Sequence, residues 1–98
     1  MSELRFEWDP GKAASNLRKH GVSFEDGRDV FYDQHGLLLD DPDHSAVEER
    51  FILLGLSASA GMLVVVHCYR RHRDVIRLIS ARRASRRERE RYAQGWKP

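Results

Sequence analysis

The chain lacks the features that define several large protein classes. Its 98 residues include one cysteine, Cys68, so no disulfide can form within the chain, and a lone cysteine is typical of a reducing compartment. No apolar run approaches the roughly 20 residues that a membrane helix needs, and the first residues lack the apolar core of a signal peptide. We therefore expect a cytoplasmic protein with no membrane segment.

Recognised motifs for cofactors and metals are also missing. The sequence has no Gly-rich phosphate loop, no zinc-binding pattern and no nucleophile elbow. One acidic stretch could hold a metal ion, but its spacing matches no known ligand pattern, and acidic loops are usually only solvated. The stretch consists of Asp40, Asp41, Asp43, His44 and Glu48. We expect no metal and no cofactor.

Charge is abundant but unevenly distributed. Residues 1–67 hold six basic and twelve acidic residues, a net charge of −6, whereas residues 68–98 hold eleven basic and three acidic residues, a net charge of +8. Such segregation indicates a site for a polyanion on one side and a cationic partner or a solvated face on the other. A chain of this length allows one domain, which we place at 1–98.

Apolar patterning and turn residues predict an α+β domain. Strands are expected at 5–8, 37–39, 49–56, 62–69 and from Val75 onward, and helices at 10–20, from Ser23 to about Tyr32, and at 86–94. The order is therefore β-α-α-β-β-β-β-α. Short connections between the later strands favour antiparallel neighbours, so we expect an antiparallel sheet with the first two helices on one face and the short last helix beside the other face.

The ends of the helices have clear signals. Asp9 followed by Pro10 is an N-cap with proline at the first helical position, and Ser85-x-x-Glu88 is a capping box. In the first helix Lys12, Asn16 and Lys19 are three or four residues apart, so we expect them to share a basic face.

The C-terminal third carries arginines on a strand, on a corner and on a helix. Strict alternation along the strand places Arg77 with Val75 and Ile79, and Arg82 on the opposite face. Each arginine could pair with a carboxylate such as Glu7, Glu48 or Glu49. For the cluster as a whole we favour a shared phosphate-binding cleft, because the guanidinium fork suits phosphate. The cluster consists of Arg70, Arg71, Arg77, Arg82 and Arg83.

Histidine and tyrosine side chains are the candidates for proton transfer. His20 is expected at a helix C-terminus, where the dipole favours its charged form, so it is either a candidate acid or a capping residue. His67 lies in an apolar strand and is more often a core residue than a catalytic one. Tyr92 could donate a proton, stack on a base, or anchor the last helix to the sheet.

Three groups of residues, in the right order, resemble the BrnT toxin family across about residues 5 to 92. They are Phe6-x-Trp8-Asp9-x-x-Lys12-x-x-x-Asn16-x-x-Lys19-His20-Gly21-Val22-x-Phe24, then Asp43-His44-x-x-x-Glu48-x-Arg50, then Arg77-x-Ile79-Ser80-Ala81-Arg82-x-Ala84-x-x-x-Glu88-Arg89-x-x-Tyr92. The resemblance implies a RelE-like fold and a type II toxin that cleaves RNA. It also implies a BrnA-type antitoxin with a ribbon-helix-helix half, a heterotetramer of two toxins and two antitoxins, and operator DNA bound only through the antitoxin.

Two hypotheses follow from the residues and the resemblance together. In the first, the protein is a metal-independent endoribonuclease in which the RNA 2′-hydroxyl attacks the adjacent phosphate. Arg77 and Arg82 then stabilise the phosphorane, His20 or His67 acts as acid or base, and Tyr92 is the alternative. Flanking phosphates are expected to contact Lys19, Arg50, Arg70, Arg71 and Arg83. In the second, the protein is a non-catalytic module that binds nucleic acid or a partner.

Overall fold

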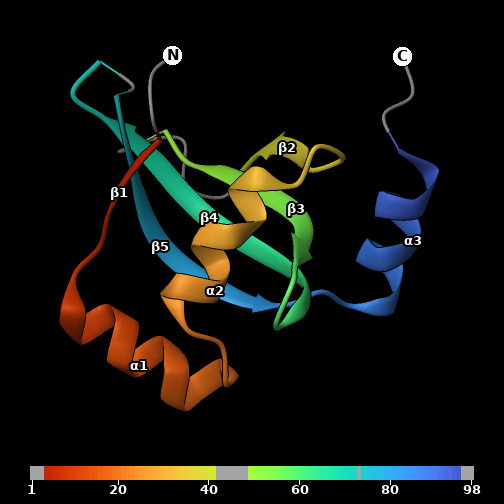
Figure 1. The fold of residues 1–98 in the computed structure, drawn as a ribbon, viewed down its shortest axis with the longest axis horizontal. Helices are drawn as coiled ribbons and strands as arrows, with labels where there is room; N and C mark the ends of the chain where they lie inside the picture. The colour runs from red at the N-terminus through yellow and green to blue at the C-terminus, as the bar shows by residue number, and fades with distance from the viewer. Residues whose placement is uncertain (1–3, 42–48, 73, 96–98) are drawn as a thin grey trace.

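Five strands form one sheet with three α-helices around it in the computed structural model, which describes residues 4–41, 49–72 and 74–95 (Figure 1). The elements are β1 (Arg5–Glu7), α1 (Pro10–His20), α2 (Phe24–Asp29), a 3-10 turn η1 (Val30–Tyr32), β2 (Leu37–Asp40), β3 (Phe51–Ser57), β4 (Gly61–Arg70), β5 (Val75–Arg83) and α3 (Arg86–Gln94). This architecture confirms the α+β class, with two N-terminal helices and a short C-terminal helix.

The sheet is mixed and has the strand order β1-β5-β4-β3-β2. The three consecutive pairs from β2 to β5 are antiparallel, as the short connections predict for the β3–β4 and β4–β5 pairs, and the apolar strand β4 is central. However, β1 pairs parallel with β5, so the sheet is not purely antiparallel. Short loops fix the relative direction of sequence neighbours only, and residues 8–74 lie between β1 and β5.

The helices begin and end where the local signals indicate. The Asp9 side chain accepts a hydrogen bond from the Lys12 amide at the start of α1, and Gly21 ends that helix with a left-handed φ of 70°. At α3 both halves of the capping box form between Ser85 and Glu88. These contacts satisfy backbone groups that a helix end leaves without partners.

The main core lies between the sheet and the layer formed by α1 and α2, which Figure 1 shows on one side of the strands. Phe24, Leu63 and Leu78 are its largest fully buried apolar residues. Gly27 brings α2 close to β5, because a Cβ at this position would lie 3.2 Å from the Cβ of Ala81. The close approach explains why a glycine is accommodated inside a helix despite its low helix propensity.

Asn16 belongs to this core and not to an exposed basic face, so the prediction for that side of α1 is wrong. Its side chain is 6% exposed. The amide nitrogen donates to the carbonyls of Val22 (3.0 Å) and Ala81 (2.8 Å), and its oxygen accepts from the Ala81 amide (3.1 Å). Leu17, the next residue of the helix, is half exposed. Three hydrogen bonds make it possible to bury this polar side chain, which the residue spacing predicts to be exposed.

A bulge in β5 changes which face the arginines occupy. His67 of β4 pairs with Leu78 and the preceding residue, Val66, pairs with Ser80, so Ile79 is an extra residue. After the bulge, Arg82 pairs with Val64, which shares a face with Cys68, the partner of Arg77. Arg77 and Arg82 therefore lie on the same face of the sheet, away from α1 and α2, and not on opposite faces as strict alternation predicts.

The second face has a smaller core under α3. Leu37, Leu54, Val64 and Ala84 are buried there, with Tyr92 packed against them. No residue of α3 is itself buried. Among the described residues, no helix is both long and apolar enough to span a membrane.

Candidate active site

The structure separates the predicted site residues into distinct groups. Arg77, Arg82 and Tyr92 lie on the side of the sheet away from α1 and α2. Lys19 and His20 lie in the last turn of α1, and Arg83 lies beside Gly21, which ends that helix. Arg50, Arg70 and Arg71 lie at the end of the sheet where β3 begins and β4 ends, and His67 is in the core.

Arg77 is held by a carboxylate from the neighbouring strand. Its Nη1 donates to Oε2 of Glu7 at 2.7 Å, and the two residues are direct partners in the β1–β5 pairing. This hydrogen bond raises the pKa of Arg77 above its ordinary value. The pair is about one-third exposed, so it adds little to stability. Glu7, one of the carboxylates predicted as possible partners, therefore forms an ion pair with Arg77.

Arg82 is held by Glu88 in a two-point contact. Nη1 and Nη2 donate to the two carboxylate oxygens at 2.8 and 2.9 Å. Glu88 also accepts from the Ser85 amide as part of the capping box. The hydrogen bond from Arg82 is the main cause that lowers the pKa of Glu88 to about 2. The guanidinium is thereby fixed to the first turn of α3, while 43% of its side chain is exposed.

These contacts contradict the expectation of one shared arginine cleft. Arg77 and Arg82 share a face, but five residues of an extended strand separate their Cα atoms by roughly 16 Å. Each guanidinium has its own carboxylate. The two guanidinium groups therefore do not converge on one phosphate in this structure, and their positions alone do not indicate RNA cleavage.

Lys19, His20 and Arg83 form a basic group on the other face. Lys19 and His20 are in the last turn of α1. A Cβ at Gly21 would lie 3.7 Å from Nη1 of Arg83, so this guanidinium stands beside the end of the helix. The negative end of the helix dipole attracts cations at this position. The group is basic and accessible, but the sheet separates it from Arg82 and Tyr92.

His67 is fully buried, with 0% exposure. Its Nδ1 carries a proton, because it bonds to the carbonyl of Val65 at 3.2 Å and a carbonyl can only accept. Its Nε2 then accepts from the hydroxyl of Tyr69 at 3.3 Å. Burial is the main cause that lowers the pKa of His67. A neutral imidazole without exposed surface cannot contact an RNA phosphate in this conformation, so His67 has no role in the cleavage step proposed for this protein.

Tyr92 fastens α3 to the sheet through Asp33. The phenol donates to Oδ2 of Asp33 at 2.7 Å, and the same oxygen accepts from the Leu56 amide at 2.8 Å. Burial is the main cause that raises the pKa of Tyr92 to about 12, and the bond to Asp33 adds to it. Burial tends to raise the pKa of Asp33, but its hydrogen bonds from Leu56, Tyr92 and His35 outweigh that effect and lower it.

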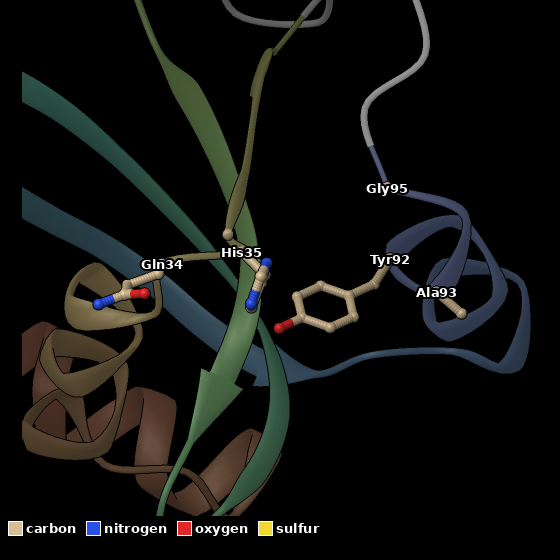
Figure 2. Close-up of a pocket in the computed structure, with 6 residues that line it drawn as sticks. Gln34, His35, Tyr92, Ala93 and Gly95 are labelled. Carbon is tan, nitrogen blue, oxygen red and sulfur yellow. The ribbon is translucent and has the colours of Figure 1, made fainter.

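A hollow of about 430 Å³ opens beside this contact. Its lining comes from the turn before β2 and from the end of α3, and consists of Gln34, His35, Gly36, Tyr92, Ala93 and Gly95. Figure 2 shows the imidazole of His35 and the phenol of Tyr92 directed toward one another. Glu88 lies one helical turn before Tyr92, so Arg82 is tied to the same side of α3, about 6 Å along its axis.

Sequence reasoning missed two residues of this arrangement, Asp33 and His35. Part of the signal was available, because an Asp often bonds to the backbone amide two residues later, and Asp33 Oδ1 accepts from the His35 amide at 2.9 Å. The contact between Asp33 and Tyr92 joins residues 59 positions apart. A local sequence pattern cannot predict a contact over this separation.

The remaining predictions concern the far end of the sheet and the possible metal group. Arg70 ends β4 and Arg71 begins the turn to β5, while Arg50 directly precedes β3. In the acidic stretch, Asp43, His44 and Glu48 lie outside the described residues. Within the described ranges, no group of three His, Cys, Asp or Glu side chains could hold a metal ion.

A guanidinium, an imidazole and a phenol beside one helix are chemical groups that can act on a phosphate ester. The family comparison is more specific. Residues 8–88 match the family described as "Ribonuclease toxin, BrnT, of type II toxin-antitoxin system". The match covers most of the chain, so the protein belongs to this family, as its motifs indicate. Ribonuclease activity and an antitoxin partner follow at the family level. No curated protein matches the chain.

Proposed function

We propose that this protein is a metal-independent endoribonuclease, acting in the cytoplasm, with an active site formed by Arg82, His35 and Tyr92 beside α3. The family match over residues 8–88 carries the proposal for the reaction. The hollow beside Tyr92, with Arg82 fixed on the same side of α3, supports the location. Arg77 and His20, which the sequence also predicts as catalytic, lie away from this hollow and have no role in the proposed scheme.

The reaction begins with the 2′-hydroxyl of a nucleotide bound in the hollow. His35 accepts the hydroxyl proton, because it is the imidazole that lines the hollow and it is exposed. The 2′-oxygen attacks the adjacent phosphorus, and the bond to the 5′-oxygen of the next nucleotide breaks. That oxygen takes a proton from water, and the hydroxide that remains takes the proton held by His35, so the imidazole becomes neutral again. The products are a 2′,3′-cyclic phosphate and a free 5′-hydroxyl.

Arg82 stabilises the extra negative charge on the phosphorane. Arginine has five N–H donors, and three of those of Arg82 are used by Glu88 and by the carbonyl of Arg83. Two donors and 43% of the side chain stay available to a phosphate oxygen. Glu88 holds the guanidinium in place before the substrate arrives, which is the arrangement that electrostatic stabilisation requires.

Tyr92 acts as a positioning residue in this scheme. Its proton is donated to Asp33 and its pKa is raised to about 12, so it is a poor proton donor near neutral pH. Its ring packs on the small core under α3 and forms one wall of the hollow. Flanking phosphates are proposed to contact the other basic groups, at Lys19 and Arg83 and at Arg50, Arg70 and Arg71.

The test is RNA cleavage by the purified protein with EDTA present. We expect cleavage to continue in EDTA, and an Arg82→Ala variant to lose about 100- to 1000-fold in rate, as does removal of one preorganised donor elsewhere. His35→Ala should lose about 100-fold. Lys12→Ala removes one exposed positive charge from α1 and serves as the control.

Three outcomes would count against the proposal. Loss of cleavage in EDTA would contradict metal independence. Normal cleavage by Arg82→Ala would remove that residue from the site. RNA binding without any cleavage by the unaltered protein would favour the alternative, a non-catalytic nucleic-acid or partner-binding module.

We further propose that a BrnA-type ribbon-helix-helix antitoxin neutralises the toxin. The family match supports an antitoxin partner, and the separation of charge along the chain supports a partner that covers one face. The expected complex has two toxins and two antitoxins and contacts operator DNA through the antitoxin. Light scattering of the co-purified complex measures its mass, and RNA cleavage by that complex should be undetectable.

A further inference from the structure

A second hollow, of about 250 Å³, lies at the end of the sheet where β3 begins and β4 ends. Phe51, Tyr69, Glu49 and His72 line it. Figure 1 shows the β4–β5 turn and α3 at opposite ends of the molecule, so this hollow is remote from the proposed active site. None of its four lining residues takes part in the proposed cleavage.

Two aromatic side chains form its wall, and both are held in place. The rings of Phe51 and Tyr69 meet edge to face, with centroids 5.2 Å apart. The Tyr69 hydroxyl bonds to Nε2 of the buried His67 at 3.3 Å, and the Phe51 ring also contacts His67. Both rings are only partly buried. An aromatic surface that is fixed before binding loses little entropy when a flat ligand stacks on it.

The turn beside the hollow is cationic and has an unusual backbone. Arg71 and His72 have φ values of 52° and 58°, in the left-handed region that residues other than glycine rarely adopt. Both side chains are exposed, and Arg70 directly precedes them. Such backbone conformations often occur at binding and catalytic sites. A guanidinium next to an aromatic hollow supplies the contact that a phosphate needs beside a stacked base.

We propose that this hollow binds a base of single-stranded RNA, several nucleotides away from the cleaved bond, with Arg71 on the neighbouring phosphate. The ligand class follows from the chemistry, because unpaired bases stack on aromatic side chains while cations contact the backbone. The inference rests on the proposed function for the identity of the polymer. It adds a subsite that secures the RNA independently of the groups that cut it.

The experiment measures binding of a fluorescently labelled RNA oligonucleotide with 2′-O-methyl groups, which lacks the attacking hydroxyl and cannot be cut. A Phe51→Leu variant should bind about 5- to 10-fold more weakly than the unaltered protein, in the range of losing one stacked base. Phe31→Leu is the matched control. Phe31 also packs on His67 but does not line the hollow, so its variant should bind like the unaltered protein.

Two further arms separate base stacking from charge alone. An oligonucleotide that carries abasic sugars has no base to stack, so Phe51→Leu and Phe31→Leu should bind it with equal affinity. A dinucleotide, too short to span both ends of the sheet, should also bind the two variants equally when it is held at the active site. If Phe51→Leu fails to fold, Arg71→Ala replaces it, because Arg71 is exposed in a turn, and it should weaken binding of the long oligonucleotide.

Equal binding of the long oligonucleotide by folded Phe51→Leu and Phe31→Leu would overturn the inference. It would also be overturned if Phe51→Leu weakened binding of the abasic strand as much as binding of the ordinary strand. When Phe51→Leu does not fold, unchanged binding by Arg71→Ala would do the same. The proposed function fails separately. If the unaltered protein cuts no RNA but Phe51→Leu still weakens binding, the subsite stands and the nuclease proposal falls.

Discussion

The first and last α-helices attach to the same sheet in different ways. α1 is fixed by Asn16, which makes three buried hydrogen bonds next to the main core. α3 has no buried residue and is fixed by an ion pair between Arg82 and Glu88 and a hydrogen bond between Tyr92 and Asp33. The helix that stabilises the domain and the helix that shapes the proposed active site are therefore different parts of the molecule.

The largest expected effect comes from Asn16→Ala. This change leaves two carbonyls and one amide buried without partners, and each unsatisfied group costs about 1–3 kcal/mol. We expect the free energy of unfolding to fall by about 3 kcal/mol or more, measured by urea denaturation. Leu17→Ala, at a half-exposed neighbour in the same helix, should lose far less. Similar losses for the two variants would mean that Asn16 does not fix α1.

The next effect concerns Glu88→Ala, which removes both the capping box and the partner of Arg82. We expect the opening free energy of α3 to fall by about 1–2 kcal/mol, as seen in amide hydrogen exchange, while β4 stays protected. RNA cleavage should fall as well, because Arg82 is no longer held. Glu90→Ala is the control, since Glu90 only meets the highly exposed Arg86 at 3.5 Å. Equal effects of the two variants would contradict the role of Glu88.

A smaller effect is expected for Tyr92→Phe. The ring stays in the small core under α3, and the hydrogen bond to Asp33 is lost at a cost of about 1 kcal/mol. Amide exchange in α3 should quicken modestly, and RNA cleavage should fall only slightly if Tyr92 positions the hollow. Tyr32→Phe, at a residue that is 63% exposed, should change neither quantity. Complete loss of cleavage in Tyr92→Phe would instead identify the hydroxyl as catalytic.

The attachment of α3 should also depend on pH, whereas that of α1 should not, because Asn16 does not titrate. The pKa of Glu88 is lowered from 4.5 to about 2, so its contribution is complete above pH 4.5 and is lost as the pH falls toward 2. The pKa of Tyr92 is raised from 10.0 to about 12, so its contribution is complete below pH 10 and is lost as the pH rises toward 12.

NMR spectra recorded across the acid range can follow both helices in one sample. Signals of α3 should shift toward those of an unattached helix between pH 4.5 and 2, before α1 changes. Because the ion pair is partly exposed, salt should reduce the size of this step. Simultaneous changes in α1 and α3 would show that the two attachments are not independent.

Much of the fold could be predicted from the sequence because its signals are local. Asp9, Ser85 and Glu88 act within one helical turn, and short turns from β3 to β4 and from β4 to β5 make these neighbours antiparallel. The direction of β1 was not predictable in this way, since its partner β5 is far away in the chain. The burial of Asn16 depends on Ala81, 65 residues later.

The candidate site was harder to predict for the same reason. The extra residue Ile79 moves Arg82 to the face that holds Arg77, and no pattern within β5 reveals a bulge whose partner is β4. Glu7 is among the possible partners that the sequence predicts for Arg77, and the two residues do form an ion pair. The partner of Arg82 is Glu88, six residues later, and the capping-box pattern that predicts the contact of Glu88 with Ser85 does not reveal its second contact with Arg82.

The most direct test of the proposed chemistry is cleavage of an RNA in which a single 2′-hydroxyl, at a mapped cleavage position, is replaced by hydrogen. With EDTA present, we expect the unaltered strand to yield a 2′,3′-cyclic phosphate at that position and the substituted strand to remain intact there, with cleavage elsewhere unchanged. Scission of the substituted strand at the same bond would contradict attack by the 2′-hydroxyl and, with it, the roles given to His35 and Arg82.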